Sequence, residues 1–391
     1  MLASLRAFVL YYGKNNAKYR GEKAMAGSTF GTIFKVMTWG ESHGKGIGVV
    51  IDGCPAGIPL SEEDIQPFLN RRKPGQNRYT TKRAESDLVE ILSGTFEGKT
   101  TGTPISLLVW NQDQRSRDYS TIAQLYRPGH ADYTYDAKYG FRDYRGGGRS
   151  SGRETIARVA AGAVAEKLLA ELGVAFTAYV RSIGPVEVDP ANFDASRIEE
   201  SSLRMPDEKA EQRALVWLEN CLSAQDSSGG VVECIVEHLP AGLGEPAFEK
   251  LDANLAKALM SIGAVKAVEI GEGTNASRLH GSENNDCYQE NEDGAVDKTT
   301  NHSGGILGGI SDGSPLQIRA SFKPTPSIAQ PQSMLSRDGH CVTETIQGRH
   351  DPTVVTRAVV VVEAMTALTL ADHLLLNMTS RLDQIKKVYG K

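Results

Sequence analysis

The spacing of hydrophobic positions along the chain predicts several helices. The clearest of them spans Gly152–Leu172, where apolar side chains recur at helical intervals on one face. These side chains are Ile156, Val159, Ala160, Ala163, Val164 and Leu168. Ser151 can cap the start of this helix. A second helix is expected from Ser61, where the string SEED supplies an N-cap and early acidic residues, and it would end before Pro74.

Three further segments are also expected to be helical. Two of them, Pro206–Ala224 and Pro246–Met260, begin at a proline, which suits the first turn of a helix. The apolar stretch Ala358–Ala371 is interrupted by Glu363 and is shorter than the roughly 20 residues of a membrane span. It therefore predicts a helix buried in the protein core.

Short β-branched and aromatic runs predict strands between these helices. Thr32–Thr38 and Val49–Ile51 flank glycine turns. Further strands are expected over Gly230–Val236, Val265–Ile270 and Leu316–Phe322. The order of strands and helices is mixed, which favours an α+β sandwich over a doubly wound parallel sheet. No repeat or low-complexity linker divides the chain, so a single large domain is expected.

Four long stretches lack a regular pattern, and loops of such length are usually functional or disordered. They are Arg71–Arg83, Asn111–Gly148, Glu272–Gly305 and Lys323–Gly348. The first two are rich in Arg, Tyr, His and Gly, which suits a functional site. Gly281–Asp297, inside the third, is acidic and rich in Asn, which suits an exposed excursion.

Composition narrows the class of protein. The 391 residues include 43 basic and 48 acidic side chains, a formal charge of −5, which excludes a strongly basic nucleic-acid binder. Five cysteines without a CxxC pair indicate neither a disulfide framework nor a zinc ribbon, and they fit a reducing cytoplasm. Residues 1–24 carry five basic side chains and one acidic one. We expect them to be an extension or a non-native start outside a domain spanning 25–391, with a targeting peptide as the alternative.

Clustered cations in an acidic chain predict a binding site for an anion. One group lies within thirteen residues that include no acid: Arg71, Arg72, Lys73, Arg78, Lys82 and Arg83. A second group flanks a triple glycine: Arg142, Arg145, Arg149, Arg153 and Arg158. Several guanidinium groups together with helix-start amides suit phosphate and carboxylates, although a solvated basic face would have the same composition.

The segment Gly147–Glu154, GGRSSGRE, has the glycine frame of a phosphate loop. Arg153 replaces the lysine of that motif, and Glu154 replaces the Ser or Thr that would hold Mg²⁺. These replacements oppose a phosphate-loop nucleotide enzyme. A non-catalytic protein that binds a phosphorylated ligand remains an alternative.

Three residues are candidates for proton transfer: His43 in GESHG, His130 in RPGHADYTYDAKYG and Asp351 in GRHDP. Each lies in a glycine-containing loop, where it could equally form a turn. Histidine is the side chain most easily tuned to move protons near neutral pH. No HxxxH or HxH spacing joins them, so no metal site is expected.

Long strings in these loops are similar to those of one known family. They are GESHG at 40–44, RRKPGQNRYTTKR at 71–83, RPGHADYTYDAKYG at 127–140, DYRGGGRSSGRET at 143–155, FKPTPSI at 322–328 and GRHDP at 348–352. Together they closely resemble the chorismate synthases. The resemblance runs from Met25 to about Asn377 and leaves out residues 1–24.

The resemblance implies a β-α-β sandwich, a homotetramer and a lyase of the shikimate pathway, which supplies aromatic amino acid biosynthesis. Chorismate synthases form chorismate from 5-enolpyruvylshikimate 3-phosphate by 1,4-anti elimination of phosphate. They require reduced FMN although the reaction has no net redox change. Because no additional length for flavin reduction is evident, the resemblance also implies an external flavin reductase, with NADPH serving only indirectly. No nucleic acid or membrane partner is expected.

Site residues follow from the resemblance position by position. The substrate anions would be bound by Arg72, Arg78, Arg127, Arg153 and Arg349, and NADPH is attached in the family to the positions of Arg72 and Arg78. The flavin would be bound by Arg149, Ser150, Ser151, Gly263, Ala264, Gly308, Lys323, Pro324, Thr325, Pro326, Ser327 and Arg349. His43 would protonate the departing phosphate, and His130 would hold or protonate the flavin near N1. The C6 proton would leave to flavin N5, with Asp351 relaying it onward.

Overall fold

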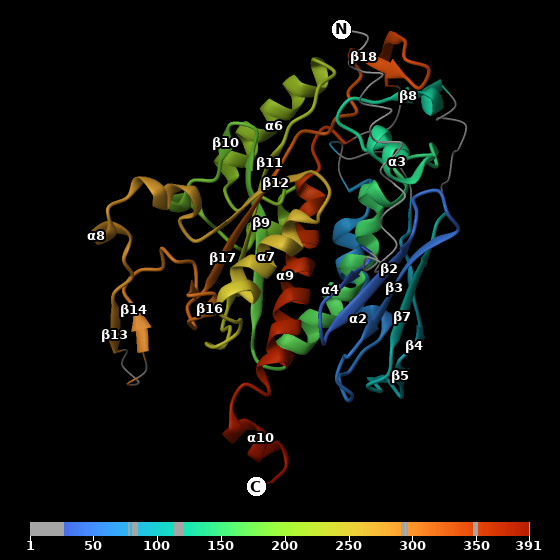
Figure 1. Ribbon diagram of the computed structural model, residues 1–391. Helices are drawn as coiled ribbons and strands as arrows, with labels where there is room; N and C mark the ends of the chain where they lie inside the picture. The colour runs from blue at the N-terminus through green and yellow to red at the C-terminus, as the bar shows by residue number, and fades with distance from the viewer. Residues whose placement is uncertain are drawn as a thin grey trace, which may run out of the picture.

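The computed structural model describes residues 27–76, 79, 85–112, 121–290, 294, 296–346 and 351–390. Two five-stranded antiparallel sheets enclose a layer of helices, so that the described chain forms a β-α-β sandwich (Figure 1). This arrangement confirms the predicted α+β class. The expectation for residues 1–24 concerns a part of the chain outside the described residues and stays a prediction.

The first sheet has the strand order β1-β2-β3-β7-β4. Its strands are Thr29–Phe30, Lys35–Gly40, Gly46–Asp52, Ile105–Trp110 and Val89–Ser93, in that order. Alternate side chains of the central strands, such as Val36, Ile51 and Ile105, lie in one row and are buried against the helices. The opposite face of this sheet carries no helix among the described residues.

The second sheet has the order β10-β9-β11-β17-β12. Its strands are Val186–Glu187, Ala175–Ile183, Gly230–Glu237, Leu316–Phe322 and Val265–Ile270. The last three confirm the predicted strands, whereas the long strand β9 had no prediction. Every pairing in both sheets is antiparallel, as expected for a mixed order of elements.

Between the sheets lie α2 (Glu62–Arg72), α4 (Thr155–Ala170), α7 (Leu251–Met260) and α9 (Val355–Asn377), visible at the centre of Figure 1. Helices α4 and α9 approach closely because Gly162 faces Ala364, where an added Cβ would lie 2.3 Å from the alanine side chain. By length and composition α9 could cross a membrane, but 83% of its most apolar window is buried inside the protein. The prediction of a core helix is therefore confirmed.

Helices α2 and α6 begin at the predicted caps, whereas the helix predicted from Gly152 begins only at Thr155, after a 3₁₀ turn at Gly152–Glu154. Ser61 and Asp64 form a capping box at the start of α2, and α6 spans Glu208–Ser223 as expected. The predicted helix Pro246–Met260 begins only at Leu251. Residues Ala247–Glu249 form a separate 3₁₀ turn, and Ala247 has a φ of +65°, which a continuous helix does not allow.

The strand expected from Thr32 begins instead at Lys35, and Asp372 supplies the reason. Its carboxylate, on α9, accepts hydrogen bonds from the backbone N–H groups of Thr32, Ile33 and Phe34 at 2.7–2.9 Å. Amides committed to this carboxylate cannot also pair with a neighbouring strand. Asp372 thereby ties the start of the first sheet to the core helix.

Stretches without a predicted pattern contain short elements. A three-stranded sheet combines β8 (Leu125–Tyr126), β18 (Pro331–Ser336) and β19 (Cys341–Thr345), next to α3 (Asp132–Tyr139). The predicted excursion at 281–297 contains α8 (Gly281–Asn284), β13 (Tyr288–Glu290) and β14 (Val296–Lys298), and its described residues are mostly exposed, as expected. The remaining elements are β5 (Thr95–Phe96), β6 (Lys99–Thr100), β15 (Ile306–Leu307), β16 (Ile310–Ser311), α5 (Arg197–Glu200) and α10 (Leu382–Val388).

Candidate active site

A cavity of about 760 Å³ opens beside the N-terminal ends of α4 and α9. Its walls come from the loop after β2, the end of α2 and the segments 127–131, 146–155, 261–264, 322–327 and 351–361. Cavities of roughly 300–1,000 Å³ hold small-molecule ligands. Partial positive charge at the two helix N-termini favours an anionic ligand.

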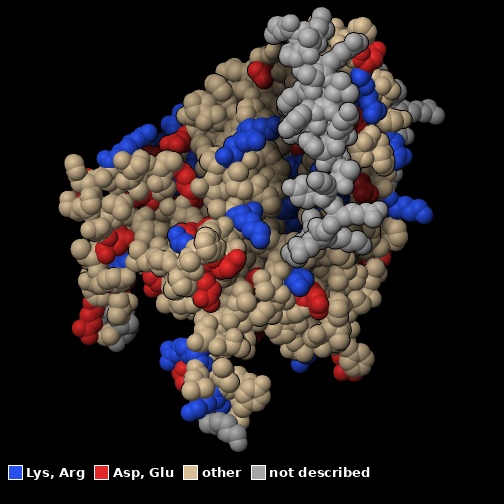
Figure 2. All heavy atoms as spheres, in the orientation of Figure 1, with Lys and Arg blue, Asp and Glu red and all other residues tan. Residues whose placement is uncertain are grey.

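The charges around this cavity also favour an anion. Its described lining contains eight Lys and Arg residues but only two carboxylates, those of Glu154 and Asp351. Figure 2 shows Lys and Arg side chains gathered near the middle of one face of the molecule. The basic clusters predicted from the sequence therefore contribute to a site and not only to a solvated surface.

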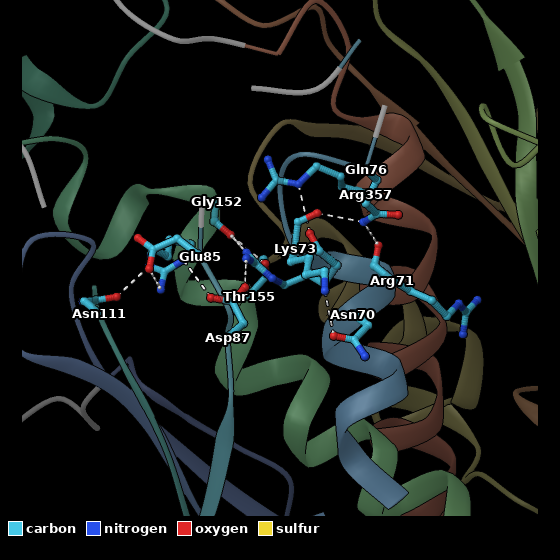
Figure 3. Close-up of polar contacts among 12 residues, drawn as sticks. Asn70, Arg71, Lys73, Gln76, Glu85, Asp87, Asn111, Gly152, Thr155 and Arg357 are labelled. Carbon is cyan, nitrogen blue, oxygen red and sulfur yellow. Dashed lines mark hydrogen bonds and ion pairs between the residues drawn. The ribbon is translucent and has the colours of Figure 1, made fainter. Parts of the chain in front are cut away.

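Two of these arginines share one buried carboxylate. Arg72, the last residue of α2, places Nη2 2.6 Å from Oδ2 of Asp87. Nη1 of Arg153 lies 3.0 Å from Oδ1 of the same Asp87, and its Nε donates to Asn111 Oδ1 at 2.6 Å (Figure 3). All three charged side chains are at most 5% exposed. The shared carboxylate fixes both guanidinium groups at the cavity wall.

The ionisation of this cluster depends on burial and mutual charge. Burial and the nearby cations Arg357 and Arg153 lower the pKa of Arg72 to about 10, against the opposing effect of Asp87. Arg72 therefore remains protonated at neutral pH. Burial alone would raise the pKa of Asp87, but Arg72 and Arg153 lower it below its ordinary value. An anion in the cavity would relieve the repulsion among the guanidinium groups.

His43 lies in the loop after β2, with Nδ1 3.1 Å from the hydroxyl of Ser42. Gly146 packs directly against its ring: an added Cβ there would lie 2.7 Å from the ring atoms Cε1 and Nδ1. Gly146 also has a φ of +86°, which L side chains rarely adopt. The glycine-rich loop thus packs against the imidazole and limits its movement, and His43 lines the cavity.

His130 is held through both ring nitrogens. Nδ1 lies 2.9 Å from the carbonyl oxygen of Pro128, and Nε2 lies 2.8 Å from the hydroxyl of Ser327. Because a carbonyl only accepts hydrogen bonds, Nδ1 carries a proton, and in the neutral ring Nε2 accepts from Ser327. The pair joins two predicted site residues that lie 197 positions apart.

Arg127 and Asp351 are also fixed by ion pairs at the cavity. Arg127 donates from Nε and Nη2 to the two carboxylate oxygens of Asp132 at 2.7 and 2.8 Å. Burial raises the pKa of Asp132, but Arg127 and Arg142 overcome this effect and lower it. Asp351 pairs with Nη1 of Arg357 at 2.6 Å.

Most residues predicted to bind flavin lie together along this cavity: Arg149, Ser150, Ser151, Gly263, Ala264, Lys323, Thr325, Pro326 and Ser327. Arg149 donates to Thr38 Oγ1 at 2.6 Å and to the carbonyl of Gly40 at 3.1 Å. Lys323 Nζ donates to the carbonyl of Gly129 at 2.8 Å, and its backbone N–H donates to Ala264. Neither cation has an ion pair with a described carboxylate.

Some predicted positions do not line the cavity. Pro324 does not line the cavity, although its neighbours Lys323 and Thr325 do. Gly308 occupies the turn between β15 and β16. Arg78 and Arg349 lie outside the described residues. The roles predicted for these four residues stay predictions, as do the roles of the residues that line the cavity.

The phosphate-loop frame at Gly147–Gly152 forms a different structure here. Two 3₁₀ turns, Gly148–Ser150 and Gly152–Glu154, follow a loop and not a strand, whereas a phosphate loop connects a strand to a helix. Ser151 caps the second turn and accepts from the backbone N–H of Arg153 at 3.3 Å, so the predicted capping role is confirmed one turn before α4. Arg153 contacts Asp87 and Asn111 and also lines the cavity.

Sequence reasoning missed four residues that shape the site: Asp87, Asn111, Arg357 and Glu85, whose buried carboxylate lies 3.3 Å from Nη2 of Arg153. Glu85 and Asp87 lie in a short acidic string, ESD, that has no catalytic pattern. Arg357 follows a proposed catalytic motif by a few residues, but it also directly precedes the predicted core helix Ala358–Ala371. Only the proximity of Arg357 to the GRHDP string offered a signal.

A β-α-β sandwich with arginines, two histidines and two carboxylates lining a single cavity has the features of an enzyme that acts on a small anionic molecule. Comparison with known proteins agrees. A sequence profile of the chorismate synthase family matches residues 34–375. Chorismate synthase of Agathobacter rectalis is 63% identical over 367 residues, which cover 94% of this chain and 100% of that protein. The enzyme of Lachnoclostridium phytofermentans is 62% identical with the same coverage.

Structural similarity points the same way. A crystal structure of chorismate synthase superimposes with a TM-score of 0.72 and 33% sequence identity, covering 92% of this chain and 97% of that one. The chain is therefore an enzyme of the carbon–oxygen lyase class. It belongs to the chorismate synthase family.

Proposed function

We propose that the protein forms chorismate from 5-enolpyruvylshikimate 3-phosphate by 1,4-anti elimination of phosphate, with reduced FMN. The observation that carries this proposal is the convergence of His43, His130 and Asp351 on a cavity lined by eight cations. The substrate carries a phosphate and two carboxylates, and such groups are the preferred partners of guanidinium groups. Arg72, Arg127 and Arg153 would bind them.

The donors along one side of the cavity suit a flavin phosphate and ring. Arg149 and Lys323 meet only neutral oxygens among the described residues, so their charge remains available to an anion. Thr325 has a buried hydroxyl without a hydrogen-bond partner, and it lines the cavity. Ala264 has a φ of +75°, a strained conformation typical of ligand-binding turns. These features support FMN binding by this set of residues.

In the proposed mechanism, Arg149, Ser150 and Lys323 would hold reduced FMN, which would supply transient electron density to the forming diene. His43 donates a proton to the departing phosphate oxygen, which favours cleavage of the C–O bond. Asp351 carries the C6 proton away from the cavity. His130 keeps its own proton on Nδ1, and with Nε2 and Ser327 it would help to hold the flavin. A ligand bound between these walls would displace water and strengthen these electrostatic interactions.

NADPH is proposed to act only through flavin reduction by a separate reductase. Arg72 supports this view because its side chain is 2% exposed and lies in the same cavity as the substrate groups. NADPH contacts at Arg72 and Arg78 would then overlap the substrate site. Five free cysteines fit the proposed location in a reducing cytoplasm.

We also propose that the chain assembles as a homotetramer, through faces that include the uncovered side of the first sheet. Met37, Trp39 and Trp110 lie on that side and are 40–49% exposed. Trp39 packs against Gly48, where an added Cβ would be 2.4 Å from the indole. Large apolar side chains grouped on one sheet face are typical of subunit interfaces.

An anaerobic assay tests the proposed reaction. The protein would receive 5-enolpyruvylshikimate 3-phosphate with chemically reduced FMN, with oxidised FMN or with reduced FMN plus NADPH. We expect equal amounts of chorismate and phosphate with reduced FMN, no product with oxidised FMN and no added effect of NADPH. Tight substrate binding without product would instead identify a non-catalytic binding protein.

A further inference from the structure

Arg357 joins three parts of the active site, and no role above includes its side chain. Its Nε donates to the main-chain oxygen of Arg72 at 3.0 Å, and its Nη1 pairs with Oδ2 of Asp351 at 2.6 Å. Figure 3 shows the Arg357 side chain close to the C-terminal end of α2. Arg357 itself lies in the first turn of α9 and lines the cavity.

We infer that Arg357 is a positioning residue, which fixes Asp351 and the Arg72 end of α2 relative to the core helix α9. The inference rests on the proposed function, because it assigns Asp351 to proton transfer and Arg72 to substrate binding. Arg357 acts through these two residues and not on the reacting atoms.

The contact with Asp351 provides the first part of the argument. The two side chains are 20% and 10% exposed, so the ion pair is largely shielded from water. The residues that follow Arg357 along α9 are buried, and they give the guanidinium a rigid base. A carboxylate that transfers a proton must lie within hydrogen-bond reach of it, and displacement by about 1 Å can cost about 100-fold in rate.

The contact with Arg72 provides the second part. Arg72 is the last residue of α2, and carbonyl groups in the last turn of a helix have no partner within that helix. Arg357 Nε supplies the missing partner for this carbonyl. It thereby fixes the backbone from which the Arg72 side chain reaches Asp87 and the cavity.

A planar guanidinium can make both contacts at once because Nε and Nη1 lie on different edges of the group. A lysine has one nitrogen at the end of a flexible chain. It can approach Asp351, but it cannot also replace Nε at the Arg72 carbonyl. Arg357→Lys therefore separates the two contacts.

Steady-state kinetics with chemically reduced FMN test the inference on the full chain. Arg357→Ala should lower kcat by up to about 100-fold. It should also raise KM by about 2- to 10-fold, the range expected for one lost hydrogen bond. Arg357→Lys should restore most of kcat and leave KM raised. Arg181→Ala is the matched control, because Arg181 forms an ion pair of similar exposure with Glu233 away from the cavity and should have wild-type kinetics.

A double variant distinguishes this role from a general structural one. Because Arg357 acts on kcat through Asp351, Arg357→Ala combined with Asp351→Asn should have the kcat of Asp351→Asn alone. The inference would be overturned if the kcat of the double variant were lowered by the product of the two single losses. It would also be overturned if Arg357→Ala had wild-type kcat and KM. If the wild-type protein does not turn over the substrate, the proposed function fails; if it does and Arg357→Ala matches it, only the positioning role fails.

Discussion

Replacing Asp87 with asparagine should lower the free energy of unfolding by about 3–5 kcal/mol, the cost of leaving buried charges without their partner. Asp87 is fully buried, and its two oxygens lie 2.6 and 3.0 Å from the guanidinium groups of Arg72 and Arg153. Asparagine keeps the shape of the side chain, so the loss reports the charge. Removing the negative charge of Asp87 should also leave the cavity with one more uncompensated positive charge.

The pH dependence of stability should change with this substitution. The pKa of Asp87 in the folded protein lies below its ordinary value of 3.8. A carboxylate of this kind stabilises the folded state above the pKa of the unfolded chain, and this contribution disappears as the pH falls through the folded value. The difference between the wild-type protein and Asp87→Asn should therefore be full at pH 7 and shrink as the pH falls below about 4.

Inorganic phosphate should restore part of the lost stability, because an anion beside Arg72 and Arg153 replaces the missing charge. Urea denaturation with and without phosphate, at one protein concentration, measures both effects. Urea is uncharged and does not screen the cluster. The control is Asp252→Asn, which removes a half-exposed pair with Lys250 and should cost less than about 1 kcal/mol. The reasoning would be refuted if Asp87→Asn and Asp252→Asn lost equal free energy of unfolding. It would also be refuted if phosphate stabilised these two variants equally.

Three further substitutions test other contacts. Gly146→Ala should lower kcat by about 100-fold, because its Cβ would displace His43; steady-state kinetics with unchanged kcat would contradict this. Asp372→Asn should lower the free energy of unfolding by about 1.5–3 kcal/mol, measured by urea denaturation, since three backbone amides lose a charged acceptor. His130→Ala should reduce turnover by about 10²- to 10⁴-fold, whereas His340→Ala on the exposed β18–β19 turn should have wild-type turnover.

Elements with strong local signals could be predicted from the sequence. Ser61 and Asp64 encode the start of α2 within four residues, and α4 and α9 carry enough apolar positions to be recognised as buried helices. Elements that depend on distant partners could not. Strand β18 pairs with β8, about 200 positions earlier, and neither segment has a pattern of its own. The start of β2 at Lys35 depends on Asp372, which no local rule connects to it.

The candidate site shows the same division. The histidines and most arginines could be predicted because their loops resemble those of a known family. Glu85, Asp87 and Arg357 could not, because a partner that holds another side chain needs only suitable charge and position. Such partners carry no fixed spacing from the group that they support.

The carboxylate partners explain how the arginines can both stabilise the fold and bind a ligand. Arg72, Arg127 and Arg153 are each anchored by a carboxylate on the protein side, so each is held in place before a ligand arrives. Binding then orders few additional side-chain bonds, which lowers its entropic cost. Arg149 and Lys323 contact only neutral oxygens among the described residues and therefore contribute uncompensated charge. The arginines that are anchored by a carboxylate fix the geometry of the site, whereas Arg149 and Lys323 supply the net attraction for an anion. Neutralising Arg149 should therefore reduce the salt dependence of anion binding more than neutralising Arg127.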